Sequence, residues 1–245
     1  MSDSERSAQQ YDEMAVSYAA ENETNIFNSL FERPSTITLL GDVSGRAVLE
    51  VGCGAGPLTA WLLDHGAEVT AMDASPRMLD LARQRVGNRA GLVAGSLEDG
   101  LDFQPDRSVD LVVASLVLHY VRDWHPVFSE FRRVLVPGGV VVFSTHHPAM
   151  DWQLHSVEDY FAVKQVTETW TMLGEPFDVT FWRRPLTAMT AAVSSAGFVI
   201  EQLVEPVPGP EIEQRDPEIA RRLRTEPSFI FFRVRQQGEC VLDVR

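Results

Sequence analysis

Val48-Leu-Glu-Val-Gly-Cys-Gly-Ala-Gly56 is a short apolar run that leads directly into three alternating glycines. Glycine lets the backbone turn tightly and approach a ligand closely, because it has no Cβ atom. A second apolar run, 67–72, ends at Asp73, 17 residues after the last of these glycines. A carboxylate in that place can accept hydrogen bonds from both hydroxyl groups of a ribose. The segment therefore predicts a pocket for a cofactor that contains a nucleoside.

The composition is that of a soluble, acidic, single-domain protein. The chain has 245 residues and a formal net charge of −14, with 35 acidic residues against 21 lysines and arginines. This length suits one domain, so we expect a single domain over 1–245. A strongly acidic surface disfavours nucleic acid and anionic membranes, so we expect no nucleic-acid partner and no membrane insertion.

The cysteines and the N-terminus favour a cytoplasmic location. Cys53 and Cys240 are far apart in the sequence and form no CxxC or His/Cys cluster. This pattern is typical of reduced thiols in a cytosolic protein, and it predicts no metal site. The first residues are polar and contain no apolar signal core, which agrees with that location.

Apolar runs alternate with helical segments along most of the chain. Such alternation predicts a parallel sheet with helices on both faces. A serine followed by a proline at Ser75-Pro76 is typical of a helix start. The expected strands are 46–51, 67–72, 91–94, 109–114, 140–145, 198–204 and 228–234, and the expected helices are 58–64, 76–86, 124–135 and 186–196.

Two segments depart from this alternation. Residues 1–40 are expected to form a helical N-terminal cap, with disorder over 1–8 and an interruption at Pro34. Residues 148–184 contain two alternating runs, 160–172 and 176–182, which resemble paired strands. We therefore expect a small β-rich insertion after the fifth strand of the sheet.

Two classes of cofactor compete for the glycine turn. A dinucleotide site usually has the spacing G-x-G-x-x-G, whereas here the second gap, between Gly54 and Gly56, is one residue shorter. Glu50 precedes the first glycine by two residues, where a carboxylate suits a ligand with an ammonium group better than a pyrophosphate. Asp73 fits either class, so the residues alone leave both open.

Four motifs in order give the chain a family resemblance. It resembles the class I methyltransferases that depend on S-adenosylmethionine, in the subgroup shared with ubiquinone and small-molecule methyltransferases. The resemblance extends from about Tyr11 to Val234 and implies a Rossmann-like, doubly wound sheet of seven strands with the last strand antiparallel. The motifs are Leu49–Gly56, Asp73–Met78, Val109–Ser115 and Arg133–Gly139.

The resemblance implies S-adenosylmethionine as cofactor and assigns it a set of binding residues. The methionine end would be held near the glycine turn, the ribose by a carboxylate, and the adenine by residues after the second and third strands. The family often has Gly-Asp-Ala after the third strand, whereas this chain has Gly95-Ser96-Leu97. The implied residues are Glu50, Gly52, Gly54 and Ser115 for the methionine end, Asp73 for the ribose, Ala74, Met78, Ser96 and Leu97 for the adenine, and Tyr11 and Tyr18 in a lid.

Methyl transfer is an in-line displacement that proximity and orientation can accelerate strongly, and some nucleophiles also need a base. The candidate bases are His119, which follows the fourth strand, and His146 and His147, which end the fifth. Ligands of open α/β sheets bind at this carboxyl edge of the strands. Catalysis by one of these histidines is therefore the expectation.

The acceptor is expected to be a small molecule bound under the aromatic-rich insertion 148–184. Whether oxygen, nitrogen or carbon receives the methyl group stays open. The same aromatic residues could instead form a small core or the interface of a homodimer. The alternative functions are action on a peptide or protein, use of the cofactor without methylation, and an oxidoreductase that uses NAD(P).

Overall fold

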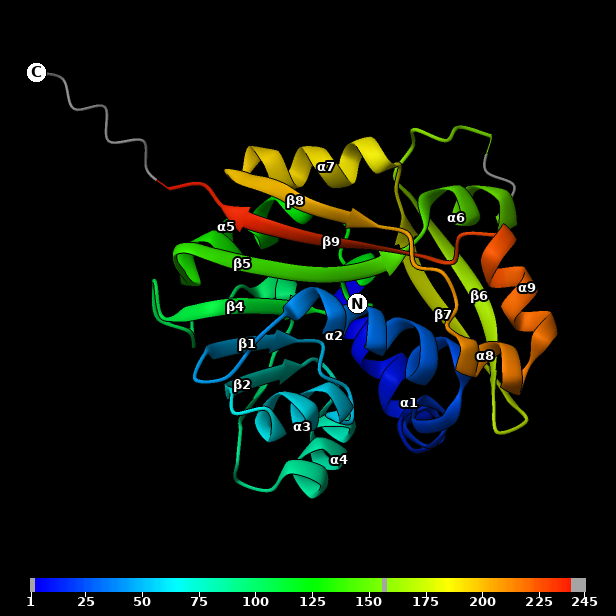
Figure 1. Cartoon of the computed structure of the whole chain (residues 1–245), viewed down its shortest axis with the longest axis horizontal. Helices are drawn as coiled ribbons and strands as arrows, with labels where there is room; N and C mark the ends of the chain where they lie inside the picture. The colour runs from blue at the N-terminus through cyan, green and yellow to red at the C-terminus, as the bar shows by residue number, and fades with distance from the viewer. Residues whose placement is uncertain (1–2, 156–157, 239–245) are drawn as a thin grey trace, which may run out of the picture.

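The computed structural model describes residues 3–155 and 158–238, which contain a seven-stranded sheet in the order β3-β2-β1-β4-β5-β9-β8 (Figure 1). Neighbouring strands are parallel except for β9, which runs antiparallel to β5 and β8. The predicted fold class and the antiparallel last strand are confirmed. The strands are β1 Ala47–Val51, β2 Glu68–Asp73, β3 Gly91–Ala94, β4 Val109–Ala114, β5 Leu135–His146, β8 Phe198–Val204 and β9 Phe229–Gln236.

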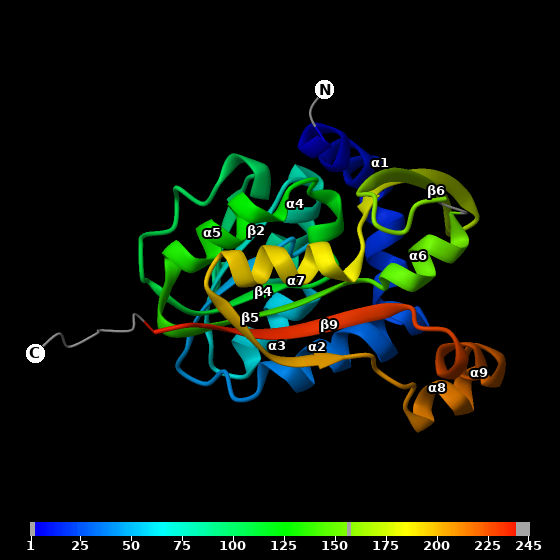
Figure 2. The ribbon, with the colours of Figure 1, turned by 90° about the horizontal axis from the view of Figure 1, so that it is seen from above.

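Helices cover both faces of the sheet, because its central strands are apolar on both sides. One face packs against α5 (Trp124–Val134) and α7 (Leu186–Ser195). The other face packs against α2 (Arg33–Leu40), α3 (Pro57–Asp64) and α4 (Pro76–Val86). Figure 2 shows α5 and α7 on one side of the sheet and α2 and α3 on the other. The carboxyl edge of the parallel strands stays free of these layers.

The N-terminal segment is helical from Asp3 to Leu40 apart from one junction residue. It consists of α1 (Asp3–Thr24), the π-helix η1 (Ile26–Glu32) and α2. The predicted interruption at Pro34 is wrong, because this proline lies in the first turn of α2, where its missing N–H costs no hydrogen bond. The predicted disorder over 1–8 is wrong from Asp3 onward, and residues 1–2 lie outside the described part.

The insertion contains a helix and a separate two-stranded sheet. Helix α6 (Pro148–Leu154) follows β5, and the strands β6 (Lys164–Met172) and β7 (Glu175–Arg183) pair antiparallel. The paired strands were predicted, although the first begins four residues later than expected. In Figure 1 the hairpin lies beside α1, and Met14 of α1 packs with Phe181 of β7.

Two predicted boundaries are wrong. Strand β5 already begins at Leu135, which pairs with Val109 before a shift in register, so Pro137-Gly138-Gly139 lies inside the strand. Such an irregularity tolerates proline and glycine. The segment between the predicted strands 198–204 and 228–234, for which no helix was predicted, contains α8 (Pro210–Arg215) and α9 (Pro217–Thr225). Two short 3₁₀ turns, η2 (Leu97–Asp99) and η3 (Leu118–Tyr120), complete the described elements.

None of the helices in the described ranges combines the length and the apolarity that a membrane-spanning helix needs.

The tightest packing constraint in the fold lies at Gly52, and it gives a test. This residue has φ +72°, and a Cβ atom built on it would lie 2.5 and 2.6 Å from two side-chain carbons of Val117. We expect Gly52→Ala to lower the free energy of unfolding by about 1–3 kcal/mol more than Gly41→Ala does, because overpacking adds to backbone strain. Gly41 has φ +69° with open space around it. Urea unfolding of both variants measures the difference, and equal losses would contradict this account.

Candidate functional site

The glycine turn brings the ends of β1 and β2 together. The amides of Gly52 and Cys53 both donate to the Met72 carbonyl oxygen, at 2.8 and 3.0 Å. The turn therefore brings the end of β1 close to Asp73, which follows Met72 and is the last residue of β2.

Asp73 is a partly buried carboxylate that organises two loops. Its Oδ2 accepts from the Gly54 amide at 2.8 Å, and its Oδ1 accepts from the Ser75 amide at 2.9 Å. Burial raises the pKa of Asp73, while these backbone donors oppose the shift. One carboxylate therefore fixes the glycine turn and the start of α4 relative to each other.

A pocket opens at this edge of the sheet, between the strand ends and the N-terminal segment. Ten of the eleven residues predicted to bind the cofactor line it, and they come from α1, from β1 and β2, and from the segments that follow β1, β2, β3 and β4. These lining residues are Tyr11, Tyr18, Glu50, Gly52, Gly54, Asp73, Ala74, Ser96, Leu97 and Ser115. The sequence motifs thus converge on one cavity, although their individual roles stay predictions.

Met78 is the predicted cofactor residue that does not line the pocket. It is fully buried on α4 and packs with Ala15 of α1 and Ala55 of the glycine turn. Its amide donates to Ser75 Oγ at 3.1 Å, as expected for the predicted helix cap. The structure therefore gives Met78 a place in the core under α1 rather than a place on the pocket wall.

Glu50 is 2% exposed, and its carboxylate accepts a hydrogen bond from a hydroxyl group. Thr59 Oγ1 donates to Glu50 Oε2 at 2.6 Å. Burial raises the pKa of Glu50 to about 8, and this donor only partly opposes the shift. The carboxyl group is consequently poised to ionise when a cation enters the pocket.

Glu32 and Arg33 line the pocket and were missed by the sequence analysis. Glu32 ends the π-helix η1 and is 3% exposed. Arg33 donates to the carbonyl oxygen of Asn22 at 3.2 Å and also to the Asn22 side chain. The signal available in the sequence was the pair Glu32-Arg33, the only charged residues in 26–40, because buried charges usually have a functional or structural partner.

Helix α1 forms one wall of the pocket. Tyr11 and Tyr120 share a hydrogen bond between their hydroxyl groups at 2.7 Å, and the ring of Tyr18 packs edge-on against Tyr11. Burial raises the pKa of Tyr11 well above its usual value. Asp12 accepts from Ser75 Oγ and, at 3.1 Å, from the Arg77 amide, so α1 is also tied to the start of α4.

The three predicted catalytic histidines do not line this pocket. His119 and His146 stack with ring centroids 4.1 Å apart, and the ring of Tyr120 separates His119 from the cavity. His147 instead caps α6 through Nδ1 and contacts Glu205 through Nε2 at 2.7 Å. Burial lowers the pKa of His119 well below its usual value and that of His146 to about 4.

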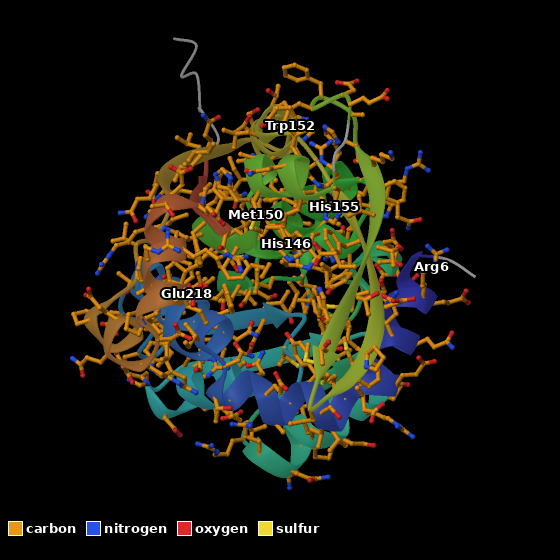
Figure 3. The ribbon with its side chains drawn as sticks, turned by 90° about the vertical axis from the view of Figure 1, so that its right-hand side faces the viewer. Arg6, His146, Met150, Trp152, His155 and Glu218 are labelled. Carbon is orange, nitrogen blue, oxygen red and sulfur yellow. The ribbon has the colours of Figure 1, made fainter. Side chains whose placement is uncertain are left out.

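The stacked histidines belong to a buried polar cluster at the insertion. His146 Nδ1 lies 3.6 Å from Asp151 Oδ1, and His155 Nε2 lies 3.1 Å from Glu168 Oε1. Burial raises the pKa of Asp151 to about 7. Figure 3 shows His146 and His155 close together inside the molecule beside the β6–β7 hairpin. No group of three or more His, Cys, Asp or Glu residues in the described ranges is placed to hold a metal ion.

The aromatic residues of the insertion form a small core with α1. Phe181 is fully buried against Met14 and Tyr120, with Trp170 and Phe177 at the edge of the same cluster. Phe161 is 70% exposed instead. This arrangement agrees with the small-core alternative in the sequence analysis, and no residue of the insertion borders the pocket described above. Cys53 is buried in the turn, and Cys240 lies outside the described residues.

The raised pKa of Glu50 makes the unliganded protein sensitive to alkaline pH. The pKa of Glu50 is about 8 in the folded state and lower in the unfolded state. Its protonated form therefore stabilises the fold fully at pH values below the unfolded-state pKa, and this stabilisation is lost as the pH rises to about 8. We expect wild-type stability to fall between pH 5 and 8 by up to about 1.4 kcal/mol per pH unit more than that of Glu50→Gln. Urea unfolding across this range measures the difference, and parallel curves would disprove the assignment. Asp151, whose pKa is also raised, is present in both proteins, so its contribution to the pH dependence cancels in the comparison.

Comparison with known proteins agrees with this geometry. A family of methyltransferase domains matches residues 49–143. Malonyl-[acyl-carrier protein] O-methyltransferase of Serratia marcescens is 38% identical over 101 residues, which are 41% of this chain and 38% of that relative. Demethylmenaquinone methyltransferase of Tropheryma whipplei is 28% identical over 198 residues, which are 67% of this chain and 82% of that relative.

Solved structures extend the likeness to most of the chain. An S-adenosylmethionine dependent methyltransferase from Mesorhizobium loti is 26% identical, with a TM-score of 0.66 over 83% of this chain and 96% of that chain. The DhpI-SAM-HEP complex shares the fold at 22% identity, with a TM-score of 0.67 over 95% of this chain and 96% of that chain. Residues 49–143 therefore match a methyltransferase domain, and the chain resembles methyltransferases that use S-adenosylmethionine over most of its length.

Proposed function

We propose that this protein transfers the methyl group of S-adenosylmethionine to a small-molecule acceptor by holding the two in line. The observation that carries the proposal is the convergence of Glu50, Asp73 and the glycine turn on one pocket walled by α1. When bound, the cofactor supplies a methyl group already activated by a positive sulfur. The protein's contribution is then to orient the reactants and exclude water, which can lower a barrier by roughly 7–11 kcal/mol.

The residues present fit the nucleoside end of this cofactor. Asp73 lies at the end of β2 and lines the pocket, where its carboxylate would accept from the ribose hydroxyls as well as from the Gly54 and Ser75 amides. Ala74, Ser96 and Leu97 line the cavity beyond it and would border the adenine. The close approach of Gly52 to Val117 leaves room there for backbone only.

The methionine end requires one site for a carboxylate and one for an ammonium group. Arg33 is the only positively charged side chain among the described residues that line the pocket, and it would bind the carboxylate. Glu50 would accept the ammonium group, with the backbone at Gly52 and Gly54 and the Ser115 side chain close by. Tyr11 and Tyr18 close the pocket from α1 as the lid.

A small-molecule acceptor is supported by the enclosed site and by the relatives. A relative that matches 67% of this chain is named demethylmenaquinone methyltransferase. The net charge of −14 disfavours a nucleic acid. The insertion would bound the acceptor side behind Tyr120, which lines the pocket from η3. A cytoplasmic location and a homodimer stay predictions.

The decisive experiment is binding by isothermal titration calorimetry. We expect S-adenosylhomocysteine to bind with micromolar affinity and NAD(P) not to bind, because Glu50 and the shortened glycine spacing suit an amino-acid end. The reverse result would overturn the proposal. Transfer of a labelled methyl group to a panel of small molecules then separates methylation from use of the cofactor without methylation.

Removal of Asp73 should weaken cofactor binding strongly. We expect Asp73→Ala to raise the dissociation constant of S-adenosylhomocysteine at least about a hundredfold, because two hydrogen bonds to a charged group are lost. Asp80→Ala is the control, since Asp80 is exposed on α4 and pairs with Arg83. Thermal unfolding checks that the variant is folded, because the Gly54 and Ser75 amides also lose their acceptor. A change below about threefold in a folded variant would exclude the ribose role.

The pH dependence tests the predicted catalytic role of the histidines. If His146 removes the acceptor's proton, kcat/KM rises through pH 4, where its pKa lies, and stays level near pH 7. We then expect His146→Gln to lower kcat/KM by about 10²–10⁴ and abolish that rise. His125→Gln is the control, because His125 is exposed and pairs with Asp123. An unchanged profile would remove His146 as the base, and His119 and His147 are tested in the same way.

A further inference from the structure

Asn22 is a pocket residue to which the proposed function assigns no task. It lies near the end of α1, on the face of the helix that also carries Tyr11 and Tyr18, because these positions are spaced by nearly whole helical turns. All three side chains line the cavity. The contacts of Asn22 show which part of the cavity it belongs to and which of its atoms can bind a ligand.

Asn22 is hydrogen-bonded to Arg33, the residue proposed to bind the carboxylate of the cofactor. Arg33 Nη2 donates to the side-chain oxygen Oδ1 of Asn22 and, at 3.2 Å, to its carbonyl oxygen. Within the described ranges, Nη1 and Nε of Arg33 make no hydrogen bond. Because a guanidinium group has five N–H donors, Arg33 can hold Asn22 and still donate to a ligand carboxylate.

The bond from Arg33 fixes which way the amide group of Asn22 points. Arg33 is a donor only, so the atom that it contacts must be the amide oxygen, and the NH2 group points away from the guanidinium. A hydrogen bond from Asn22 opposes the rise in the pKa of Tyr18 that burial causes, as a donor to the phenol oxygen does. The NH2 group has two N–H donors, so one of them is left for a partner from outside the chain.

The contact with Arg33 also places Asn22 at the amino-acid end of the site. Arg33 lies close enough to Glu50 for its positive charge to oppose the rise in the pKa of that carboxyl group. Glu50 is the residue proposed for the ammonium group, and an amino acid carries its ammonium group and its carboxylate on the same carbon atom. A ligand whose ammonium group contacts Glu50 can therefore reach Arg33 and Asn22 with its carboxylate.

The charge of the pocket favours an uncharged donor beside Arg33. Glu32, the neighbour of Arg33 in the chain, also lines the cavity and accepts from the hydroxyl groups of Thr36, Ser115 and Ser144. The acidic residues that line the cavity are Glu23, Glu32, Glu50, Asp73 and Glu98. A carboxylate ligand is repelled by these groups, and an amide N–H binds it without attracting them as a second cation would.

We propose that Asn22 donates a side-chain N–H to the methionine carboxylate of the cofactor, and that Arg33 holds the Asn22 amide in the orientation that this bond needs. The inference rests on the proposed function, which assigns the carboxylate to Arg33. Asn28 also lines the pocket, but within the described ranges its side chain makes no hydrogen bond to Arg33. Asn22 thus makes α1 part of the site that distinguishes the whole cofactor from fragments without the amino-acid end.

The test compares two ligands that share the nucleoside and the thioether sulfur. S-adenosylhomocysteine has the amino-acid end and 5′-methylthioadenosine lacks it, so isothermal titration with both isolates the effect of that end. We expect Asn22→Asp to weaken binding of S-adenosylhomocysteine at least about thirtyfold, because a donor is lost and a carboxylate faces the ligand. The affinity for 5′-methylthioadenosine should change by less than about threefold, since aspartate keeps an oxygen for Arg33.

Asn25→Asp is the matched control, because it adds the same charge three residues further along the chain and outside the pocket. Its side-chain oxygen still accepts from the Asn28 amide, so both affinities should stay as in the wild type. Thermal unfolding checks that each variant is folded. Equal losses for the two ligands in Asn22→Asp, or unchanged binding of S-adenosylhomocysteine, would overturn the inference while leaving the proposed function standing.

The wild type gives a second test that needs no variant. S-adenosylhomocysteine without its carboxylate keeps the ammonium group, and we expect it to bind at least about thirtyfold more weakly than the complete molecule. Equal affinities would overturn the inference even if Asn22→Asp does not fold. Failure of S-adenosylhomocysteine to bind the wild type would overturn the proposed function and this inference with it.

Discussion

The site depends on a steric constraint at Gly52, where the backbone passes so close to Val117 that no side chain fits. This close approach, with φ +72°, lets the Gly52 and Cys53 amides reach the Met72 carbonyl and joins the end of β1 to the end of β2. Glu50 and Asp73, 23 positions apart in sequence, consequently line one cavity. The other walls of the pocket, which include α1 and the charged residues Glu32 and Arg33, surround this joined pair of strand ends.

The sheet could be predicted because its signals are local. The strands 91–94, 109–114 and 198–204 were expected with the bounds observed, since apolar runs between glycines, polar turns and helix signals identify buried strands. The errors occur where distant contacts override local preference. Pro137-Gly138-Gly139 reads as a helix stop, yet pairing between Leu135 and Val109 extends β5 back through it. Helices α8 and α9 were missed because the proline-rich, acidic segment that contains them has few apolar residues. Ile212, Ala220 and Leu223 of these helices are buried in the cluster that contains Phe31.

In the candidate site, too, local motifs predicted some residues, and distant contacts determine the others. The residues attached to strand ends were found from their motifs, because a motif fixes both the turn and the strand that carries it. Glu32 was missed because its three hydroxyl partners come from α2, from the end of β4 and from β5, and no local pattern reports such a meeting. The histidines were expected at the cavity from the strand ends alone. Tyr120, which contacts the ring of His119, lines the pocket instead and shares a hydrogen bond with Tyr11 of α1.

The wall formed by α1 makes cofactor exchange a conformational event. Ser7, Tyr11, Tyr18 and Asn22 of one helix border the cavity, while Asp12 ties the same helix to the start of α4. Met14 and Ala15 of the same helix are buried against Phe181 and Met78, so the helix is also held by apolar packing. Under the proposed function, release of the spent cofactor would require this helix to move, because its residues border the cavity. Helix α1 would then influence the rate of turnover, although it contains none of the glycine-turn motif.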